Sequence, residues 1–202
     1  MTQLDTTTAT SIPVIDCVLM QGIPGSGKTT LARKLVEQST ADLKEVFCAA
    51  DYFYVNGVYQ FNKFKLSEYY SRVMMEFAAL TARFIDAYNM GSEKRSLLVI
   101  IDNVNIAPYA IKPYFSWISQ LQRQNPKTYM DFKLMEPDTS WKYDPEECAR
   151  RSEHSPTVHA CQEHLLELLR HQKWELPDGK QINQYSQYIL RKPRNGNNQA
   201  NG

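Results

Sequence analysis

The sequence predicts an α/β fold in which a parallel sheet carries helices on both faces. Four short apolar segments are typical of strands, and they alternate with segments of helical periodicity along the 202 residues. Because these expected strands are apolar on both faces, we expect them to be parallel and covered on both sides. A composition of 43% hydrophobic and 22% charged residues is that of an ordinary globular domain.

The first expected strand and helix surround a glycine-rich turn. Val14–Met20 is a short run rich in β-branched residues, bounded by Pro13 and by glycines, which is typical of a buried strand. Thr29–Gln38 places its leucines on one face and is expected to be an amphipathic helix. Val46–Ala49 is the second expected strand.

The middle of the chain is expected to form a long helix, the third strand and another helix. Apolar residues recur at steps of three and four through Lys65–Asn89, and Gly91 ends this helix. Leu97–Ile101 is an unbroken apolar run and is expected to be a buried strand. Pro108 begins the helix Pro108–Gln124, because proline is favoured at the first helical position.

The last part of the expected fold contains one strand and two helices. Met130–Met135 is the fourth strand, and Asp144–Ser152 is a short helix. Ser155–Arg170 is expected to be a helix with Ser155 as its N-cap and Pro156 at its first position.

One domain, spanning 13–192, is expected between two polar ends. Residues 1–12 are threonine-rich and 193–202 are of low complexity, so we expect a disordered leader and a disordered tail. A net charge of +1 excludes a strongly basic nucleic-acid wrapper but leaves a local basic groove open. The sequence does not determine the oligomeric state.

The chain carries no signal for secretion or for a membrane. Its longest apolar run is far shorter than the ~20 residues of a membrane helix, and its start lacks the pattern of a secretory signal. The four cysteines contain no CxxC pair, and scattered thiols fit a reducing compartment. We therefore expect an intracellular, cytoplasmic protein with no membrane partner; a nuclear location is left open.

A phosphate-binding loop is predicted between the first strand and the first helix. The segment from Gly22 to Thr29 matches GxxxxGK[ST] in full, and its glycines let successive N–H groups point at a phosphate chain. We expect Lys28 to reach the β- and γ-phosphates as a catalytic residue, and the Thr29 hydroxyl to bind Mg²⁺. The residues expected to bind ATP are Gly22, Ile23, Pro24, Gly25, Ser26, Gly27, Lys28, Thr29 and Thr30.

Two aspartates follow expected strands, at the edge of a parallel sheet where ligands bind. Asp102 comes directly after Leu97–Ile101 and is expected to hold Mg²⁺ through water. Asp51 is expected at the end of the second strand, where its carboxylate can accept a proton from an attacking hydroxyl. On spacing alone, a helix cap or a turn explains Asp51 equally well.

An arginine pair, Arg150-Arg151, lies between the fourth strand and the last helix. Guanidinium groups there can neutralise the charge on a transferring phosphoryl group, which makes both arginines catalytic candidates. A solvated dibasic pair is the open alternative. The four histidines lie in the same region, but their spacing does not favour a metal site.

Six segments in one order carry a resemblance to a known family: GIPGSGKTTLA (22–32), AADYF (49–53), GVYQF (57–61), VIIDNVN (99–105), FKLMEPDTSW (132–141) and RRSEHS (150–155). Over about 14–170 the chain resembles the polynucleotide-kinase-like branch of P-loop kinases. The likeness is to the eukaryotic ubiquitin-ligase-binding proteins with an ATPase or kinase module; zeta-toxin-like kinases are more distant. The resemblance implies a three-layer P-loop NTPase fold with a small lid.

The resemblance also implies roles for particular residues. The family's proton-accepting aspartate corresponds to Asp51, its lid arginine to Arg151 with Arg150 beside it, and its DNxN segment to Asp102, Asn103 and Asn105. Two departures leave the acceptor open: Ala50 stands where the family often has an acidic residue or serine, and 151–155 reads RSEHS instead of Arg-Asn-x-His-Gly.

Four functions are compared. The leading hypothesis is an ATP-dependent kinase that moves the γ-phosphate to a hydroxyl, such as a polynucleotide 5′-hydroxyl. A GTPase requires NKxD, and the nearest match, Asn62–Lys65, lacks the aspartate. Retention of Lys28, Thr29, Asp51 and Asp102 disfavours a non-catalytic ATP-binding or protein-interaction module. A small-molecule kinase stays open, because the sequence does not identify the acceptor.

Overall fold

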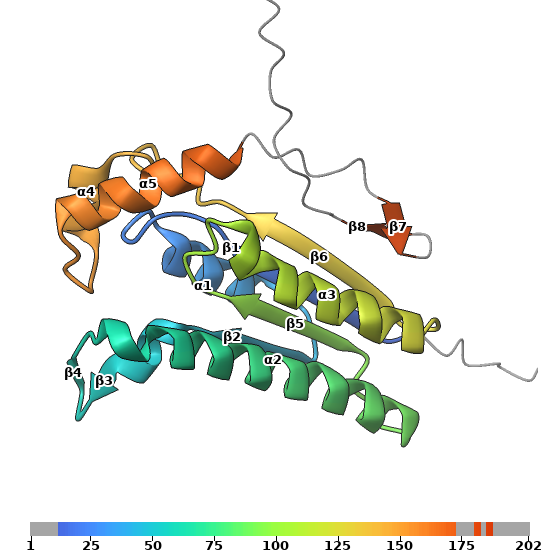
Figure 1. Ribbon diagram of the computed structural model, residues 1–202. Coiled ribbons are helices and arrows are strands. Elements are labelled where there is room, and N and C mark those ends of the chain that lie inside the picture. Colours follow the sequence, from blue (N-terminus) through green and yellow to red (C-terminus); the bar gives the residue numbers. More distant parts are fainter. Residues whose placement is uncertain (1–11, 173–179, 183–184, 188–202) are drawn as a thin grey trace, which may run out of the picture.

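The fold is built around one four-stranded parallel sheet (Figure 1). The computed structural model describes residues 12–172, 180–182 and 185–187. The strand order is β2-β5-β1-β6, with every neighbouring pair parallel. The strands are β1 (Val14–Met20), β2 (Leu43–Phe47), β5 (Ser96–Ile101) and β6 (Tyr129–Met135). The predicted parallel sheet is confirmed.

Helices cover both faces of the sheet, which gives the predicted three layers. On one face, α1 (Lys28–Gln38) packs Ala32 against Val18 and Ile100. On the other, α2 (Leu66–Asn89) and α3 (Pro108–Gln124) enclose the larger core, where Phe77 and Ile118 are fully buried against strand residues. Figure 1 shows α2 and α3 running side by side along this face.

Two further helices pack over the loop that joins β1 to α1. They are α4 (Pro145–Arg151) and α5 (Val158–Gln172). Cys148, Cys161 and Leu168 form a third buried cluster with Ile23 of the loop. Asp144 caps α4 by accepting hydrogen bonds from the backbone N–H groups of Glu146 and Glu147.

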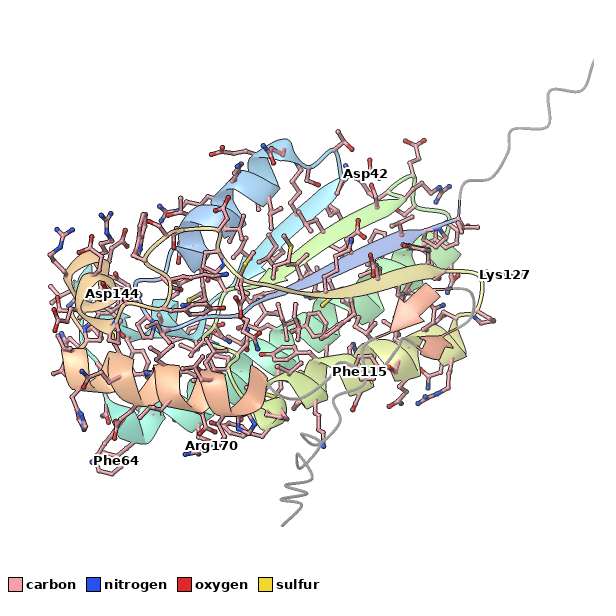
Figure 2. The ribbon with its side chains drawn as sticks, turned by 90° about the horizontal axis from the view of Figure 1, so that it is seen from above. Asp42, Phe64, Phe115, Lys127, Asp144 and Arg170 are labelled. Atoms are coloured by element: carbon pink, nitrogen blue, oxygen red, sulfur yellow. The ribbon has the colours of Figure 1, made fainter. Side chains whose placement is uncertain are left out.

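The remaining elements are short. They are η1 (Ala49–Phe53), β3 (Tyr54–Val55), β4 (Val58–Tyr59), η2 (Lys63–Lys65), β7 (Lys180–Ile182) and β8 (Tyr185–Gln187). β3 pairs with β4, and β7 pairs with β8, both antiparallel. Figure 2 shows Asp144 and Phe64 toward one end of the molecule and Asp42 and Lys127 toward the other. Because Asp42 and Lys127 precede β2 and β6, the end with Asp144 is the carboxyl edge of the sheet.

The second strand differs from the expectation of a buried strand at Val46–Ala49. β2 is the edge strand Leu43–Phe47, and its residues are mostly exposed. The Asp42 carboxylate fixes its start by accepting hydrogen bonds from the backbone N–H groups of Arg95 and Ser96 at 2.7 and 2.9 Å. An edge strand needs no apolar run on both faces, so its first residues lacked the expected pattern.

The last helix also begins later than expected. Ser155 is not its N-cap: α5 starts at Val158, and the Thr157 hydroxyl accepts a hydrogen bond from the Ala160 N–H at 3.1 Å. Ser155 has φ +45°, a left-handed conformation that turns the chain between α4 and α5.

The expected leader and tail lie outside the described residues, apart from Ile12, so the domain boundaries stay predictions. Among the helices of the described ranges, none combines the length and apolarity needed to span a bilayer.

We expect Phe77→Ala to lower the free energy of unfolding by ~3–5 kcal/mol, because it leaves a cavity between α2 and α3. Phe77 is fully buried and its ring meets that of Tyr114 edge-on at 5.3 Å. Met90→Ala is the control, since Met90 is 87% exposed at the end of α2. Urea denaturation measures both variants, and a loss for Phe77→Ala no larger than that for Met90→Ala would contradict the packing.

Candidate functional site

The predicted phosphate-binding loop joins the buried end of β1 to the first turn of α1. Gly22, Gly25 and Gly27 all have positive φ, at 147°, 76° and 103°. The first turn of α1, which begins at Lys28, contains no acidic residue, and its N-cap position is Gly27, which has no side chain to cap the helix. Its first N–H groups therefore face the loop as donors for an anion.

Lys28 lies folded into this loop. Its side chain is 8% exposed, and its ammonium donates a hydrogen bond to the Ile23 carbonyl at 2.9 Å. Burial lowers the pKa of Lys28, while the charge of Asp102 acts in the opposite direction. Thr29 and Thr30 follow on the exposed side of the helix start. A phosphate chain in the loop would give Lys28 a stronger acceptor than a carbonyl.

Asp102 lies at the end of β5, as expected, and is 5% exposed. Its backbone N–H donates to the Phe47 carbonyl at 2.9 Å, while its Oδ1 atom is buried with no hydrogen-bond partner among the described residues. A buried carboxylate oxygen without a partner is costly unless an ion or water binds it. Asp102 and the exposed Thr29 hydroxyl therefore fit a magnesium ion.

The magnesium ion would need most of its ligands from elsewhere. In the described part of the chain, no three His, Cys, Asp or Glu side chains come together as a metal-binding group. Mg²⁺ commonly binds proteins in this way, through one or two side chains, substrate phosphates and water.

Asp51 does not end the second strand, as expected, but lies beyond it in the short helix η1. The Asn103 side chain fixes this helix by accepting a hydrogen bond from the Ala49 N–H at 2.8 Å. Partial burial raises the pKa of Asp51, and the charge of Asp102 raises it further. Burial and the same two carboxylates raise the pKa of Cys48 to about 12. The structure thus brings Asp51 and Asp102 to one place.

Asn105, the last residue of the DNxN segment, has a structural role. It is 2% exposed, and its side-chain amide donates to the carbonyls of Met20 at 2.8 Å and Ile101 at 3.3 Å. The backbone carbonyl of Asn105 accepts a hydrogen bond from the Gln21 side chain at 3.0 Å. Asn105 therefore joins the ends of β1 and β5 where the loop begins.

Sequence reasoning gave no role to a segment after β6 that packs on the loop. The Thr139 hydroxyl donates to the Ser26 carbonyl at 2.8 Å, and the Trp141 indole donates to the Gly25 carbonyl at 3.3 Å. A Cβ at Gly25 would come within 1.9 Å of the Cys148 carbonyl oxygen. These contacts join residues more than a hundred positions apart, so no local spacing signals them.

The arginine pair follows this segment, and its two members differ. Both pair with Glu147, which lowers the pKa of that carboxyl to about 2. The Arg151 guanidinium also lies 4.0 Å from the centre of the Trp141 ring. The Arg151 side chain is 41% exposed and that of Arg150 is 67% exposed. Arg151 therefore contacts Trp141, which itself donates a hydrogen bond to the loop. Among the described residues, this connection is seen for Arg151 and not for Arg150.

His154 joins the α4–α5 turn to the β3–β4 hairpin. Its ring stacks on Tyr59 at 4.3 Å with an interplanar angle of 24°. Its charge would lower the pKa of Asp51, against the two causes that raise it. The α4–α5 turn, where a lid is expected, therefore meets the hairpin at the rings of His154 and Tyr59.

These features define a P-loop kinase-like fold, and comparison with known proteins confirms the resemblance. Over 156 residues the chain is 35% identical to NEDD4-binding protein 2 of Homo sapiens. This match covers 76% of the chain and 7% of the length of the human protein. A comparison with models of protein families finds no match.

Solved structures share the fold. A chain of the Pnkp1/Rnl/Hen1 RNA repair complex superposes with a TM-score of 0.53 and 15% identity, over 95% of this chain and 52% of that chain. Chaetomium thermophilum Kti12 with ADP-AlF3 gives a TM-score of 0.38 and 17% identity, over 75% of this chain and 79% of that one. The first likeness confirms the P-loop NTPase fold; the second is too weak to carry an argument.

We expect Gly25→Ala to weaken ATP binding by about tenfold or more, which corresponds to ~1.4 kcal/mol. The new Cβ would displace the Cys148 backbone from the loop. Gly91→Ala is the matched control: Gly91 also has a positive φ, at 93°, but nothing lies within 4 Å of its Cβ position. Calorimetric titration with a non-hydrolysable ATP analogue measures both variants. Equal affinities would show that the segment after β6 does not support the loop.

Proposed function

We propose that the chain is an ATP-dependent kinase that transfers the γ-phosphate of ATP to a hydroxyl, with a polynucleotide 5′-hydroxyl as the acceptor. The observation that carries the proposal is the placement of two carboxylates beside the loop: Asn103 anchors η1, which carries Asp51, at the end of β5, where Asp102 lies, and the segment after Asp102 is hydrogen-bonded to the start of the loop. A nucleotide-binding module with no transfer function has no need for a second carboxylate at this position.

Each group has a distinct task in this proposal. The loop N–H groups and Lys28 hold the β- and γ-phosphates, and Asp51 accepts the proton of the attacking hydroxyl. Thr29 and Asp102 would hold a magnesium ion, which would supply positive charge to the phosphates. Arg151 stabilises the charge that spreads over the transferring phosphoryl group.

The identity of the acceptor rests on the family resemblance, because Asp51 can accept a proton from any attacking hydroxyl. The decisive experiment is transfer from [γ-³²P]ATP to 5′-hydroxyl DNA, 5′-hydroxyl RNA, nucleosides and sugar nucleotides. Lys28→Ala is the negative control, since Lys28 is held by the loop and not by the apolar core. Labelling of an oligonucleotide that is lost in Lys28→Ala supports the proposal. Labelling of a nucleoside or sugar nucleotide alone replaces the acceptor with a small molecule.

We expect Asp51→Asn to lower the transfer rate by ~10²-fold or more while ATP affinity stays unchanged. The amide keeps the shape of the carboxylate but cannot accept the proton. A single-turnover rate and a nucleotide dissociation constant together decide the matter. Lost affinity with an unchanged rate at saturation would assign Asp51 to metal or nucleotide binding.

The pH profile tests the same residue. A base must be unprotonated, and the pKa of Asp51 is raised above its ordinary value of 3.8 by burial and by Asp102. The transfer rate should therefore rise with pH through a midpoint above that value. Asp51→Asn should lose this limb, and a limb retained in the variant would belong to another group.

For the lid, we expect Arg151→Lys to lower kcat by more than it raises the KM for ATP, and Arg150→Lys to do less. Lysine lacks the planar fork that grips two phosphate oxygens, and an interaction made in the transition state affects kcat first. Hydrogen exchange should also slow in 141–155 when ATP and Mg²⁺ are added. Normal kcat in both variants, with exchange indifferent to nucleotide, would make the pair an ordinary solvated helix face.

A further inference from the structure

A cavity of about 690 Å³ opens beside η1, outside the phosphate-binding loop. Its wall includes Tyr52, Phe53, Phe61, Lys63, Phe64 and Lys65. Tyr52 and Phe53 directly follow Asp51 in η1, so the cavity adjoins the short helix that carries the proposed proton acceptor. Its volume lies within the ~300–1,000 Å³ of ordinary ligand sites.

The inner wall of the cavity is an ordered aromatic group. The Tyr69 ring lies 5.4 Å from that of Tyr52 and 4.8 Å from that of Phe53. On its other side, Tyr52 is held by the Arg72 guanidinium, 4.3 Å from the ring centre, and by a hydrogen bond from its hydroxyl to Glu76. This wall is therefore built before any ligand arrives.

The outer wall presents aromatic faces to solvent. Phe61 is 58% exposed and Phe64 is 84% exposed. Figure 2 shows Phe64 projecting outward at the edge of the molecule. Exposed aromatic rings around a cavity, with an ordered aromatic wall behind them, are typical of surfaces on which unpaired bases stack.

The charge at this cavity is positive. Lys63 and Lys65 line it, and no Asp or Glu does so among the described residues. Glu68 pairs with Lys65 at 2.8 Å, whereas the Lys63 ammonium lies 5.2 Å from the centre of the Phe64 ring. Lys63 thus places a cation beside the most exposed ring, which suits a strand with one phosphate for each base.

We infer that this cavity binds the unpaired nucleotides of the acceptor strand that follow its 5′ end. The inference rests on the proposed function and adds a specificity to it. In a duplex, the bases that follow the terminal nucleotide are enclosed by their neighbours and partners, so they can stack on Phe61 or Phe64 only when the strand is unpaired there. The acceptor is therefore a single strand or a 5′ overhang and not a blunt duplex. Lys63 contacts the backbone, while Asp51 faces the terminal hydroxyl.

The test measures binding without ATP, so that it does not depend on transfer. The probes are ten-nucleotide 5′-hydroxyl DNA and RNA single strands labelled at the 3′ end, with a blunt duplex of the same sequence as competitor. The variants are Phe64→Ala and Lys63→Gln. Their controls are Met90→Ala and Lys94→Gln, which lie beyond the far end of α2, roughly 36 Å away for 24 residues at ~1.5 Å each.

Phe64→Ala should raise the Kd of the single strand by ~5-fold or more, the lower end of the effect of one lost base stack. Lys63→Gln should weaken binding and reduce the slope of log Kd against log salt concentration by about 0.7. The controls should stay within about twofold of the wild type, and the duplex should compete poorly. DNA and RNA strands that bind equally well support stacking as the source of affinity.

Three results would overturn the inference: no binding of either strand, equal competition by the blunt duplex, or Phe64→Ala and Lys63→Gln that bind like their controls. Other results of the same experiments decide the proposed function. Transfer that persists with unchanged oligonucleotide KM in both variants removes the cavity from the acceptor site but keeps the kinase. Strand binding that depends on Phe64, without transfer to any acceptor, supports the cavity and removes the kinase.

Discussion

The buried side chain of Asn105 is the contact on which the site depends. Parallel strands end with carbonyl groups that have no partner in the sheet, and at β1 and β5 one amide donates to both. Asn105 reaches them from a left-handed backbone conformation, with φ 42°, which asparagine tolerates better than most residues. The preceding residue, Val104, accepts a hydrogen bond from the N–H of Gly22 at 3.1 Å. The segment that follows β5 therefore fixes the start of the phosphate-binding loop.

A second segment, which lies far away in the chain, also fixes the loop. Thr139 and Trp141 donate to two of its carbonyls, which fixes the orientation of the peptide groups at Ser26 and Gly25. A loop held on two sides loses little conformational freedom when phosphate binds, so more of the interaction energy appears as affinity. The same contacts place α4 beside the loop. The position of the arginine pair is thus a consequence of how the loop is supported.

How far the fold could be predicted depended on what bounds each element. β1 and α3 were predicted to the residue, because a proline stands next to the first and begins the second. β2 was misplaced because an edge strand carries no apolar run. The β3–β4 hairpin was missed, although Asn56-Gly57, with φ 52° and 79°, is the strongest short signal for such a turn. Its strands have two residues each, too short for alternation to show.

The site was predictable where one motif holds the chemistry and not where distant segments meet. The loop, Lys28 and the place of Asp102 follow from the motif and the strand before it. The contacts of Trp141 with Gly25 and of Asn103 with Ala49 arise from packing, so only the structure shows them. The cavity beside η1 is of this kind too, since its walls come from η1, η2 and α2.

The arginine pair shows how one carboxylate can serve two cations. Arg150 contacts both oxygens of Glu147, at 2.8 and 2.6 Å, whereas Arg151 contacts only Oε1, at 2.5 Å. Arg151 can therefore leave this contact for a phosphate without leaving the carboxylate unpaired. The guanidinium lies 4.0 Å from the centre of the Trp141 ring, which keeps it near the loop. In the proposed kinase, Arg150 would keep Glu147 paired while Arg151 acts on the phosphates.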